Sequence, residues 1–185
     1  MLFRSLAIDL RKLGEVQAAR DLDQDTLDRY RRVQGQDHIS TLRSATILAH
    51  DLRELGELQA ARDLDQDTLD RQRRARGQDH PDTLNAAHNL AYDLRELGEL
   101  QAARDLDQDT LDRRRRVLGH DHPDTLTSAS NLAHDLRELG ELRAARDLDQ
   151  DTLDRRRRVL GQDHPSTLLS ASNLAIDLGA LGQGK

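Results

Sequence analysis

The stretch that decides the fold is residues 82–123, which read DTLNAAHNLAYDLRELGELQAARDLDQDTLDRRRRVLGHDHP. Nearly the same text recurs along the chain at a fixed period. The recurrence is visible in glycines that lie 42 residues apart, at Gly14, Gly56, Gly98, Gly140 and Gly182, and again at Gly35, Gly77, Gly119 and Gly161. Such self-similarity is typical of a solenoid, in which each unit stacks on its neighbours because it cannot bury its own apolar face. An enzyme needs unlike residues that converge on one place, so the pattern favours a binding scaffold.

The repeat contains two predicted helices. Apolar residues in its first half recur at spacings of three and four, at Leu84, Ala87, Leu90, Ala91, Leu94 and Leu97. This spacing predicts an amphipathic helix over about 82–97, which Gly98 ends. A second helix is predicted over 99–118, with Gly119 as a left-handed C-cap. In the connector that follows, Pro123 suits a first helical position, with Asp121 or His122 as the N-cap.

The predicted fold class is all-α, a solenoid of antiparallel helix hairpins that forms a single repeat array over 1–185. Repeats are expected at about 1–39, 40–81, 82–123 and 124–165. A terminal half repeat, 166–185, carries one more helix over 166–181. The sequence shows no linker and no second domain.

The composition bounds the function. Of the 185 residues, 34% are charged and 2% are aromatic, so the core must be thin and built from leucine and alanine. A net charge of −6 argues against general affinity for nucleic acid, which normally requires a net basic face. Cysteine is absent, so disulfides and thiolate ligands are excluded. No apolar run approaches the roughly 20 residues of a bilayer span, and the start lacks a signal sequence. We therefore expect a cytoplasmic protein that binds neither nucleic acid nor membrane.

Three parts of the repeat resemble a known family. NLAYDLRELGEL at 89–100, AARDL at 102–106 and VLGHDHPDTL at 117–126 look like tetratricopeptide repeats of the 42-residue type found in kinesin light chain. They are similar above all to arrays that accompany NB-ARC-type nucleotidase domains in actinobacterial proteins. The resemblance implies a right-handed superhelix whose first helices line a concave groove that binds peptides or proteins. The chain departs from the family pattern at Leu94, Leu100 and Asp107, where large aromatics are usual, and at Thr110, where a small alanine is usual.

Comparison of the copies with one another shows where the repeat varies. Three rows of the first helix differ between copies while the frame around them is almost unchanged, and their spacing places them on one stripe. This groove stripe consists of Arg43, Asn85, Thr127 and Leu169; Thr46, His88, Ser130 and Ser172; and His50, Tyr92, His134 and Ile176. The resemblance implies that the stripe faces the groove and binds the partner. The alternative is that exposed positions simply drift, since a fourth row, expected on the exposed face of the second helix, also varies: Tyr30, Gln72, Arg114 and Arg156.

Other chemistry in the sequence has simpler explanations. Asp105, Asp107 and Asp109 alternate as in a calcium loop, but Thr110 replaces the required glycine and Arg116 the final glutamate. The arginine runs at 113–116 and 155–158 point around the whole circumference of a helix, with acidic residues one turn earlier. They are therefore expected to form a solvated, internally paired face.

The connector histidines carry no predicted metal site. His38, His80, His122 and His164 recur once per repeat, and equivalent positions on packed helices lie on the order of 10 Å apart, too far to share an ion. They are expected to cap and pack the connector. No nucleophile has a distinctive setting, so no catalytic residue, metal or cofactor is predicted and the protein is not expected to be an enzyme.

Two further expectations concern charge and the ends of the array. Two aspartate rows near helix interfaces are expected to be neutralised by arginines, because unpaired rows would repel one another and lose hydration. These rows are Asp51, Asp93 and Asp135, and Asp23, Asp65, Asp107 and Asp149. The ends are expected to expose apolar side chains and to drive end-to-end self-association, a structural alternative to partner binding. The residues expected to do so are Leu2, Phe3 and Leu6 at the start and some of Leu168, Leu174, Leu178 and Leu181 at the end.

Overall fold

The computed structural model describes residues 2–183, with side chains from Leu6 to Gly182. Over these residues it consists of helices joined by short turns, with no strand. The helices are α1 Leu2–Lys12, α2 Val16–Gln34, α3 Ile39–Glu54, α4 Leu58–Arg76, α5 Pro81–Glu96, α6 Leu100–Leu118, α7 Pro123–Glu138, α8 Leu142–Leu160 and α9 Pro165–Gln183. They fall into two compact units, residues 1–97 with α1 to α5 and residues 98–185 with α6 to α9, and each unit is described by itself.

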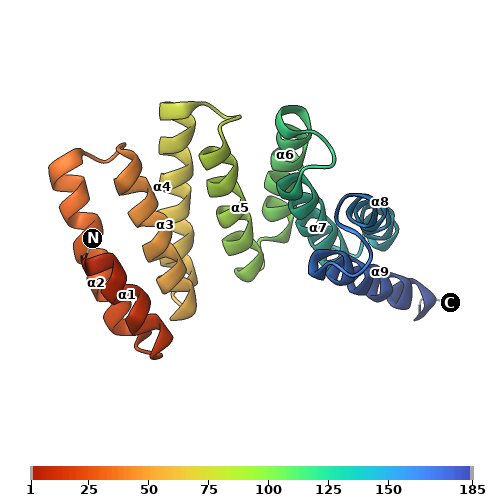
Figure 1. The fold of residues 1–185 in the computed structure, drawn as a ribbon, viewed down its shortest axis with the longest axis horizontal. Coiled ribbons are helices and arrows are strands. Elements are labelled where there is room, and N and C mark those ends of the chain that lie inside the picture. The colour runs from red at the N-terminus through yellow and green to blue at the C-terminus, as the bar shows by residue number, and fades with distance from the viewer. Residues whose placement is uncertain (1, 184–185) are drawn as a thin grey trace. The chain divides into compact units, whose positions relative to one another are not determined.

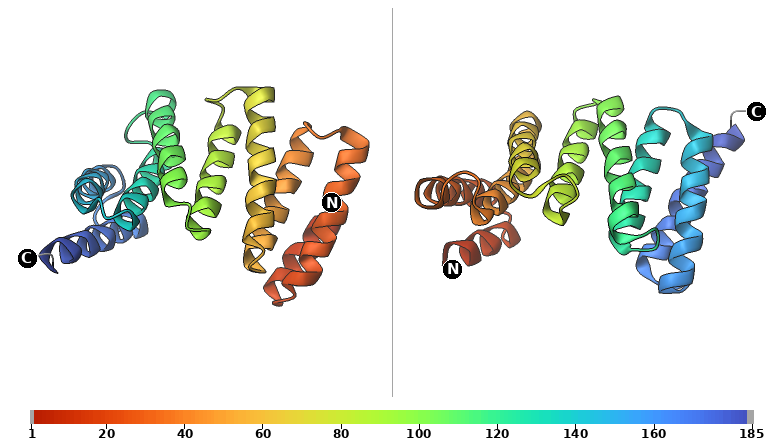
Figure 2. Two further views of the ribbon diagram at one scale, coloured as in Figure 1. Left: turned by 180° about the vertical axis from the view of Figure 1, so that it is seen from behind. Right: turned by 90° about the horizontal axis from the view of Figure 1, so that it is seen from above.

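Each unit is a row of antiparallel helices. In the first unit, α1 packs on α2, α2 on α3, α3 on α4 and α4 on α5. The second unit repeats this order, since α6 packs on α7, α7 on α8 and α8 on α9 (Figures 1 and 2). The two helices predicted over 82–97 and 99–118 are confirmed. Helix α5 begins one residue before the predicted start, at Pro81, and α6 ends at the predicted Leu118.

The connectors between hairpins are held by histidine and threonine side chains at the start of the first helices. The Nδ1 atoms of His38, His80, His122 and His164 accept hydrogen bonds from backbone amides two residues later. Histidine is therefore the N-cap, as one of the two predicted alternatives. The Thr83 hydroxyl donates to the Gly77 carbonyl at 2.8 Å, which satisfies an acceptor at the end of α4.

The glycine at the end of each second helix has an unusual backbone. Gly119 has φ 88° and ψ 165°. Its positive φ agrees with the sequence, but the predicted left-handed helical C-cap is wrong, because that conformation has ψ near 47°. Only glycine adopts this region readily. The connector therefore leaves α6 in an extended direction.

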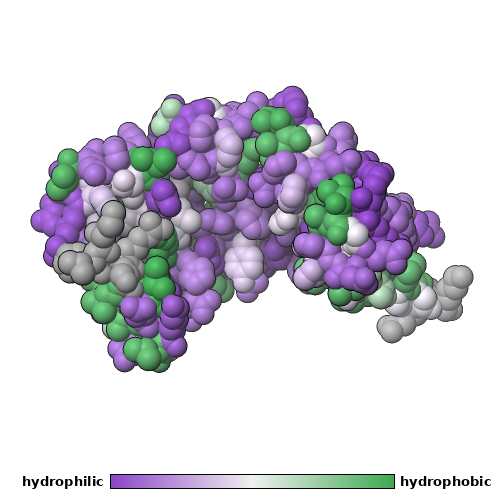
Figure 3. Space-filling model, in the orientation of Figure 1, coloured by the Kyte–Doolittle hydropathy of each residue, from purple (hydrophilic) through white to green (hydrophobic). Residues whose placement is uncertain are grey.

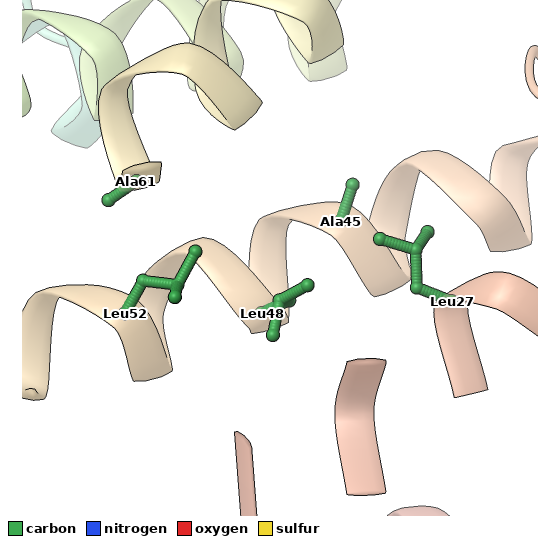
Figure 4. Close-up of a cluster of buried hydrophobic side chains, with 5 residues drawn as sticks. All are labelled: Leu27, Ala45, Leu48, Leu52 and Ala61. Atoms are coloured by element: carbon green, nitrogen blue, oxygen red, sulfur yellow. The ribbon is translucent and has the colours of Figure 1, made fainter. Parts of the chain in front are cut away.

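The core is a thin layer between the helices. In the first unit it includes a cluster of Leu27 from α2, Ala45, Leu48 and Leu52 from α3, and Ala61 from α4 (Figure 4). The equivalent cluster in the second unit is Leu111, Ala129, Leu132, Leu136 and Ala145. Each inner first helix is thus enclosed by the second helix on either side of it. On the face in Figure 3, the hydrophobic surface forms separate patches within a mostly hydrophilic surface. Within residues 2–183, no helix combines the length and apolar character of a membrane span.

Candidate protein-binding groove

The groove stripe lies on the solvent-facing side of the first helices. All of its residues are exposed or half-buried, although those of α3, α5 and α7 alternate with fully buried leucines and alanines. Tyr92, for example, is 43% exposed, whereas its neighbour Ala91 is fully buried. The variable positions are therefore accessible to a partner, and the frame beneath them is fixed by packing.

Two cavities open along this stripe in the first unit. One, of about 90 Å³, is lined by Asp23, Tyr30 and residues of α3 that include Arg43. The other, of about 220 Å³, lies among α3, α4 and α5. Its lining residues are Arg43, Thr46, Ile47, Thr68, Gln72, Asp82, Asn85, Ala86 and Asn89. We call it the Gln72 cavity. It brings stripe residues of two successive repeats together over the second helix between them.

The fourth variable row was misplaced by sequence reasoning. Tyr30, Gln72, Arg114 and Arg156 were expected on an exposed face, but Tyr30 is half-buried, and Gln72, Arg114 and Arg156 are only 4%, 4% and 5% exposed. Tyr30 and Gln72 each line one of the two cavities. We call these residues the floor row. The signal that could have found the row is spacing, because Asp65, Leu69 and Gln72 follow the i, i+4, i+7 pattern of a buried face.

The floor arginines contradict the expected solvated arginine runs at these positions. In the second unit, Arg114 Nη1 donates to the Ser128 hydroxyl at 2.8 Å and to the Asp124 carbonyl at 3.1 Å. Arg156 Nη1 donates to the Ser170 hydroxyl at 2.6 Å and to the Ser166 carbonyl. Burial lowers the pKa of both guanidinium groups. The arginines therefore bind the second helix of one repeat to the first helix of the next.

Buried carboxylate clusters confirm the expected pairing with arginine for five members of the aspartate rows: Asp23, Asp51, Asp65, Asp93 and Asp149. In each cluster one arginine bridges two aspartates from successive helices. Arg53 Nη1 donates to Asp65 at 2.8 Å and to Asp93 at 2.9 Å. The other clusters are Arg11 with Asp23 and Asp51, and Arg137 with Asp149 and Asp177. Each cluster links helices of two successive repeats, so it helps to hold these repeats against each other.

One arginine does not neutralise two buried carboxylates. Burial raises the pKa of Asp65 to about 7, against the opposing effect of Arg53. It likewise raises the pKa of Asp149 to about 7 and that of Asp23 to about 6, and in both cases the neighbouring carboxylate adds to the rise. The clusters therefore take up protons near neutral pH.

The structure also places the aspartates that resemble a calcium loop. Asp105, Asp107 and Asp109 all lie within α6, as the helical interpretation required, and Asp109 pairs with Arg113 at 2.7 Å. Within the part of the chain that the structure describes, no three His, Cys, Asp or Glu side chains group in a way that could hold a metal ion.

Solved structures share the fold. A crystal structure of a Q17M variant of a kinesin-light-chain-like protein from Podosopora anserina, described as having nearly identical TPR-like repeats, has a TM-score of 0.89 at 27% identity. The match covers 98% of this chain and 85% of that one. BtubC (BKLC) from P. vanneervenii has a TM-score of 0.86 at 20% identity, with 97% and 72% covered. A Rap protein complexed with competence and sporulation factor has a TM-score of 0.74 at 10% identity, with 98% and 48% covered.

Sequence comparison assigns the family. No curated protein sequence matches the chain significantly. The sequence profile of the tetratricopeptide repeat matches residues 1–74, 44–115, 82–157 and 129–183, which together span almost the whole chain. Tetratricopeptide repeats indicate a protein–protein interaction scaffold, and proteins built from them are generally not enzymes. The chain belongs to the tetratricopeptide repeat family.

Proposed function

We propose that the protein is a non-enzymatic scaffold that binds a segment of a partner protein along the groove stripe. The observation that carries the proposal is the position of the variation. The stripe rows vary on an accessible surface, and the floor row varies directly beneath them, where Tyr30 and Gln72 line cavities. Random drift would not select a buried row such as Gln72, Arg114 and Arg156. Recognition of different parts of one ligand by successive repeats explains both sets together.

Two features support a polypeptide partner. The stripe runs across successive repeats, so an extended segment can contact several copies at once. The Rap protein with the same fold was crystallised with competence and sporulation factor, which shows that this fold accommodates a bound partner. A cytoplasmic location belongs to the same proposal and stays a prediction from the sequence. The association with NB-ARC-type domains and the single continuous array stay predictions from the sequence.

A blocking substitution tests the proposal. Peptides would first be selected from a random display library against the whole chain, and their dissociation constants measured by fluorescence anisotropy. Asn85→Trp adds bulk at an exposed stripe position and should weaken selected peptides by about tenfold or more, which corresponds to about 1.4 kcal/mol. The matched control is Gln59→Trp on the exposed side of α4, which should change little. Equal affinity of the wild type and both variants for the selected peptides would contradict binding along the groove stripe.

A second candidate function, self-association, is supported by the surface of α9. Leu168 and Leu178 are 55% and 53% exposed, whereas their equivalents in α7, Leu126 and Leu136, are 2% and 8% exposed. Helix α7 packs on the second helices α6 and α8, whereas α9 packs on α8. The exposed surface of α9 therefore corresponds to one that is buried in α7. We propose that another copy of the chain covers it.

The other residues predicted for self-association contribute unequally. Leu6 is 50% exposed, and Leu181 is half-buried. Leu174 is only 8% exposed, so its predicted exposure is wrong: it already packs within the second unit. The side chains of Leu2 and Phe3 lie outside the described residues. The proposed contact is therefore centred on Leu168 and Leu178.

Sedimentation of a charge variant tests self-association. The double variant Leu168→Glu with Leu178→Glu should remain monomeric at concentrations where the wild type forms dimers or larger species, because burying these glutamates would cost hydration. Val117→Glu, at a comparably exposed apolar position, is the control and should associate as the wild type does. A wild type that is strictly monomeric at high concentration would exclude this function and leave partner binding unaffected.

A further inference from the structure

We propose that the Gln72 cavity binds a basic side chain of the partner segment, through a guanidinium or ammonium group inserted between α3 and α5. The inference rests on the proposed function and adds the chemistry of one position of the ligand. It is carried by three observations: the sister repeats fill the equivalent place with their own arginine, the cavity floor has buried acceptors without donors, and the neighbouring carboxylate cluster lacks a second cation.

The sister repeats act as an internal template. Residues 42 and 84 positions after Gln72 are Arg114 and Arg156, whose guanidinium groups donate to a serine hydroxyl and a main-chain carbonyl of the following helix. In the first unit, Gln72 is too short to reach so far, and Ala86 replaces the serine. A cavity of about 220 Å³ lies in front of Gln72 and Ala86. The fold therefore leaves space where other copies place a basic side chain.

Buried acceptors on the cavity floor are without partners. Gln72 is 4% exposed, and its Oε1 atom has no hydrogen-bond partner within the described residues. Thr68, which is 1% exposed and also lines the cavity, has an unpaired Oγ1 too, but so does the equivalent Thr110 in the repeat that carries Arg114, so Gln72 Oε1 is the acceptor that distinguishes this cavity. A buried polar atom without a partner is destabilising, and its cost is removed when a ligand supplies the missing bond. A guanidinium or ammonium group supplies only donors, which is what the Oε1 atom of Gln72 requires.

Charge near the cavity favours the same ligand. In the second unit, the guanidinium of Arg156 donates to Ser170 and Ser166, and its charge also favours the ionised form of Asp149 in the neighbouring cluster. The equivalent cluster in the first unit, Arg53 with Asp65 and Asp93, has Gln72 in place of that arginine. When both carboxylates are ionised, it carries one excess negative charge. A basic ligand group at the cavity would replace the missing cation.

Arg43 makes the sign of the ligand testable. It is exposed at the cavity rim, so it opposes a cationic ligand weakly and would assist an anionic one. Asp82 lines the cavity too, but its carboxylate accepts a hydrogen bond from Arg76 at 2.6 Å. Arg43→Ala should therefore strengthen binding of a basic probe by about twofold or more, as expected for the loss of one exposed like charge. It should weaken binding of an acidic probe.

The direct test uses small probes and the whole chain. N-acetyl-arginine-N-methylamide would be titrated into isotope-labelled protein, with N-acetyl-citrulline-N-methylamide as the uncharged isostere and N-acetyl-glutamate-N-methylamide as the acidic probe. We expect the arginine probe to shift the Gln72 side-chain amide resonances and to bind at least about fivefold more tightly than citrulline, because only the arginine probe carries the charge. Equal binding by citrulline, preference for the glutamate probe, or no shift at Gln72 would overturn the proposal.

A substitution in the chain provides the second arm. Gln72→Arg with Ala86→Ser rebuilds the sister-repeat arrangement and fills the cavity. It should abolish binding of the arginine probe, followed through the side-chain amides of Asn85 and Asn89, which also line the cavity. Gln59→Arg is the control, because the fourth repeat carries Arg143 at this position and the added charge lies outside the cavity. Probe binding that survives in the double variant overturns the inference. Library peptides that still depend on Asn85 would then leave the proposed function standing, so the two failures are distinguishable.

Discussion

Arg53→Met should lower the free energy of unfolding by about 3–5 kcal/mol, the cost expected when one partner of a buried ion pair is removed. Arg53 is the cation that the cluster provides for both Asp65 and Asp93, and both aspartates are fully buried. Methionine preserves much of the side-chain volume, so the loss reflects charge more than packing. Urea unfolding monitored by circular dichroism would measure it.

The control for this prediction is Arg73→Met in the same unit. Arg73 lies 3.9 Å from Asp70 in a partly exposed i, i+3 pair, and such pairs contribute about 0.2–1 kcal/mol. A similar small loss for both variants would contradict a structural role for the clusters. Restoration of Arg53→Met by Asp65→Asn and Asp93→Asn would confirm that the uncompensated charge is the cause.

Most of the fold is predictable from the sequence because the same helix pattern recurs in successive repeats. A single amphipathic pattern is weak evidence for a helix, but identical spacing of Leu84, Leu90 and Leu94 in successive copies leaves little freedom. Capping residues recur as well, so the ends of α5 and α6 agree with prediction to within about one residue. The connector glycines were predicted by type, but the ψ of Gly119 depends on tertiary packing that a local pattern does not contain.

The floor of the candidate site was not predictable in the same way. Arg114 lies within a run of four arginines, and such a run normally indicates a solvated surface. Its burial depends on Ser128 and on the Asp124 carbonyl of the next helix, whose approach is set by helix stacking. The stripe could be found from variation alone. The floor row could not be found in this way, because only the structure shows that Tyr30 and Gln72 line cavities together with stripe residues.

The aspartate clusters show how far charge reasoning extends. The sequence predicted that arginines pair with the aspartate rows, because equivalent side chains recur in every repeat. It did not predict the ratio of one cation to two carboxylates, since Arg53 donates to aspartates from two different helices. That ratio, together with burial, raises the pKa of Asp65 to about 7. Stability should therefore depend on pH in an unusual direction.

Asp65→Asn should become more stable relative to the wild type as pH rises from 5 to 8. The pKa of Asp65 is about 7 in the folded chain, against about 3.9 when unfolded. A raised pKa contributes stability that is fully present below the unfolded value and is lost as pH rises through the folded value. The wild type therefore loses on the order of 2 kcal/mol at this site across the window. Asparagine does not titrate, so the variant loses none of it.

The measurement is the difference in unfolding free energy between variant and wild type at several pH values. The carboxylate of Asp65 is ionised in the unfolded chain at both pH 5 and pH 8, but in the folded wild type it is protonated at pH 5. The difference should therefore be on the order of 2 kcal/mol smaller at pH 5 than at pH 8. At pH 8 Asp65 is ionised in the folded wild type as well, and asparagine removes its repulsion with Asp93. The matched control is Asp63→Asn, an exposed residue two positions earlier, whose difference should stay constant. A flat difference for Asp65→Asn would show that Arg53 keeps both carboxylates ionised, and the excess negative charge beside Gln72 would then be present throughout this range.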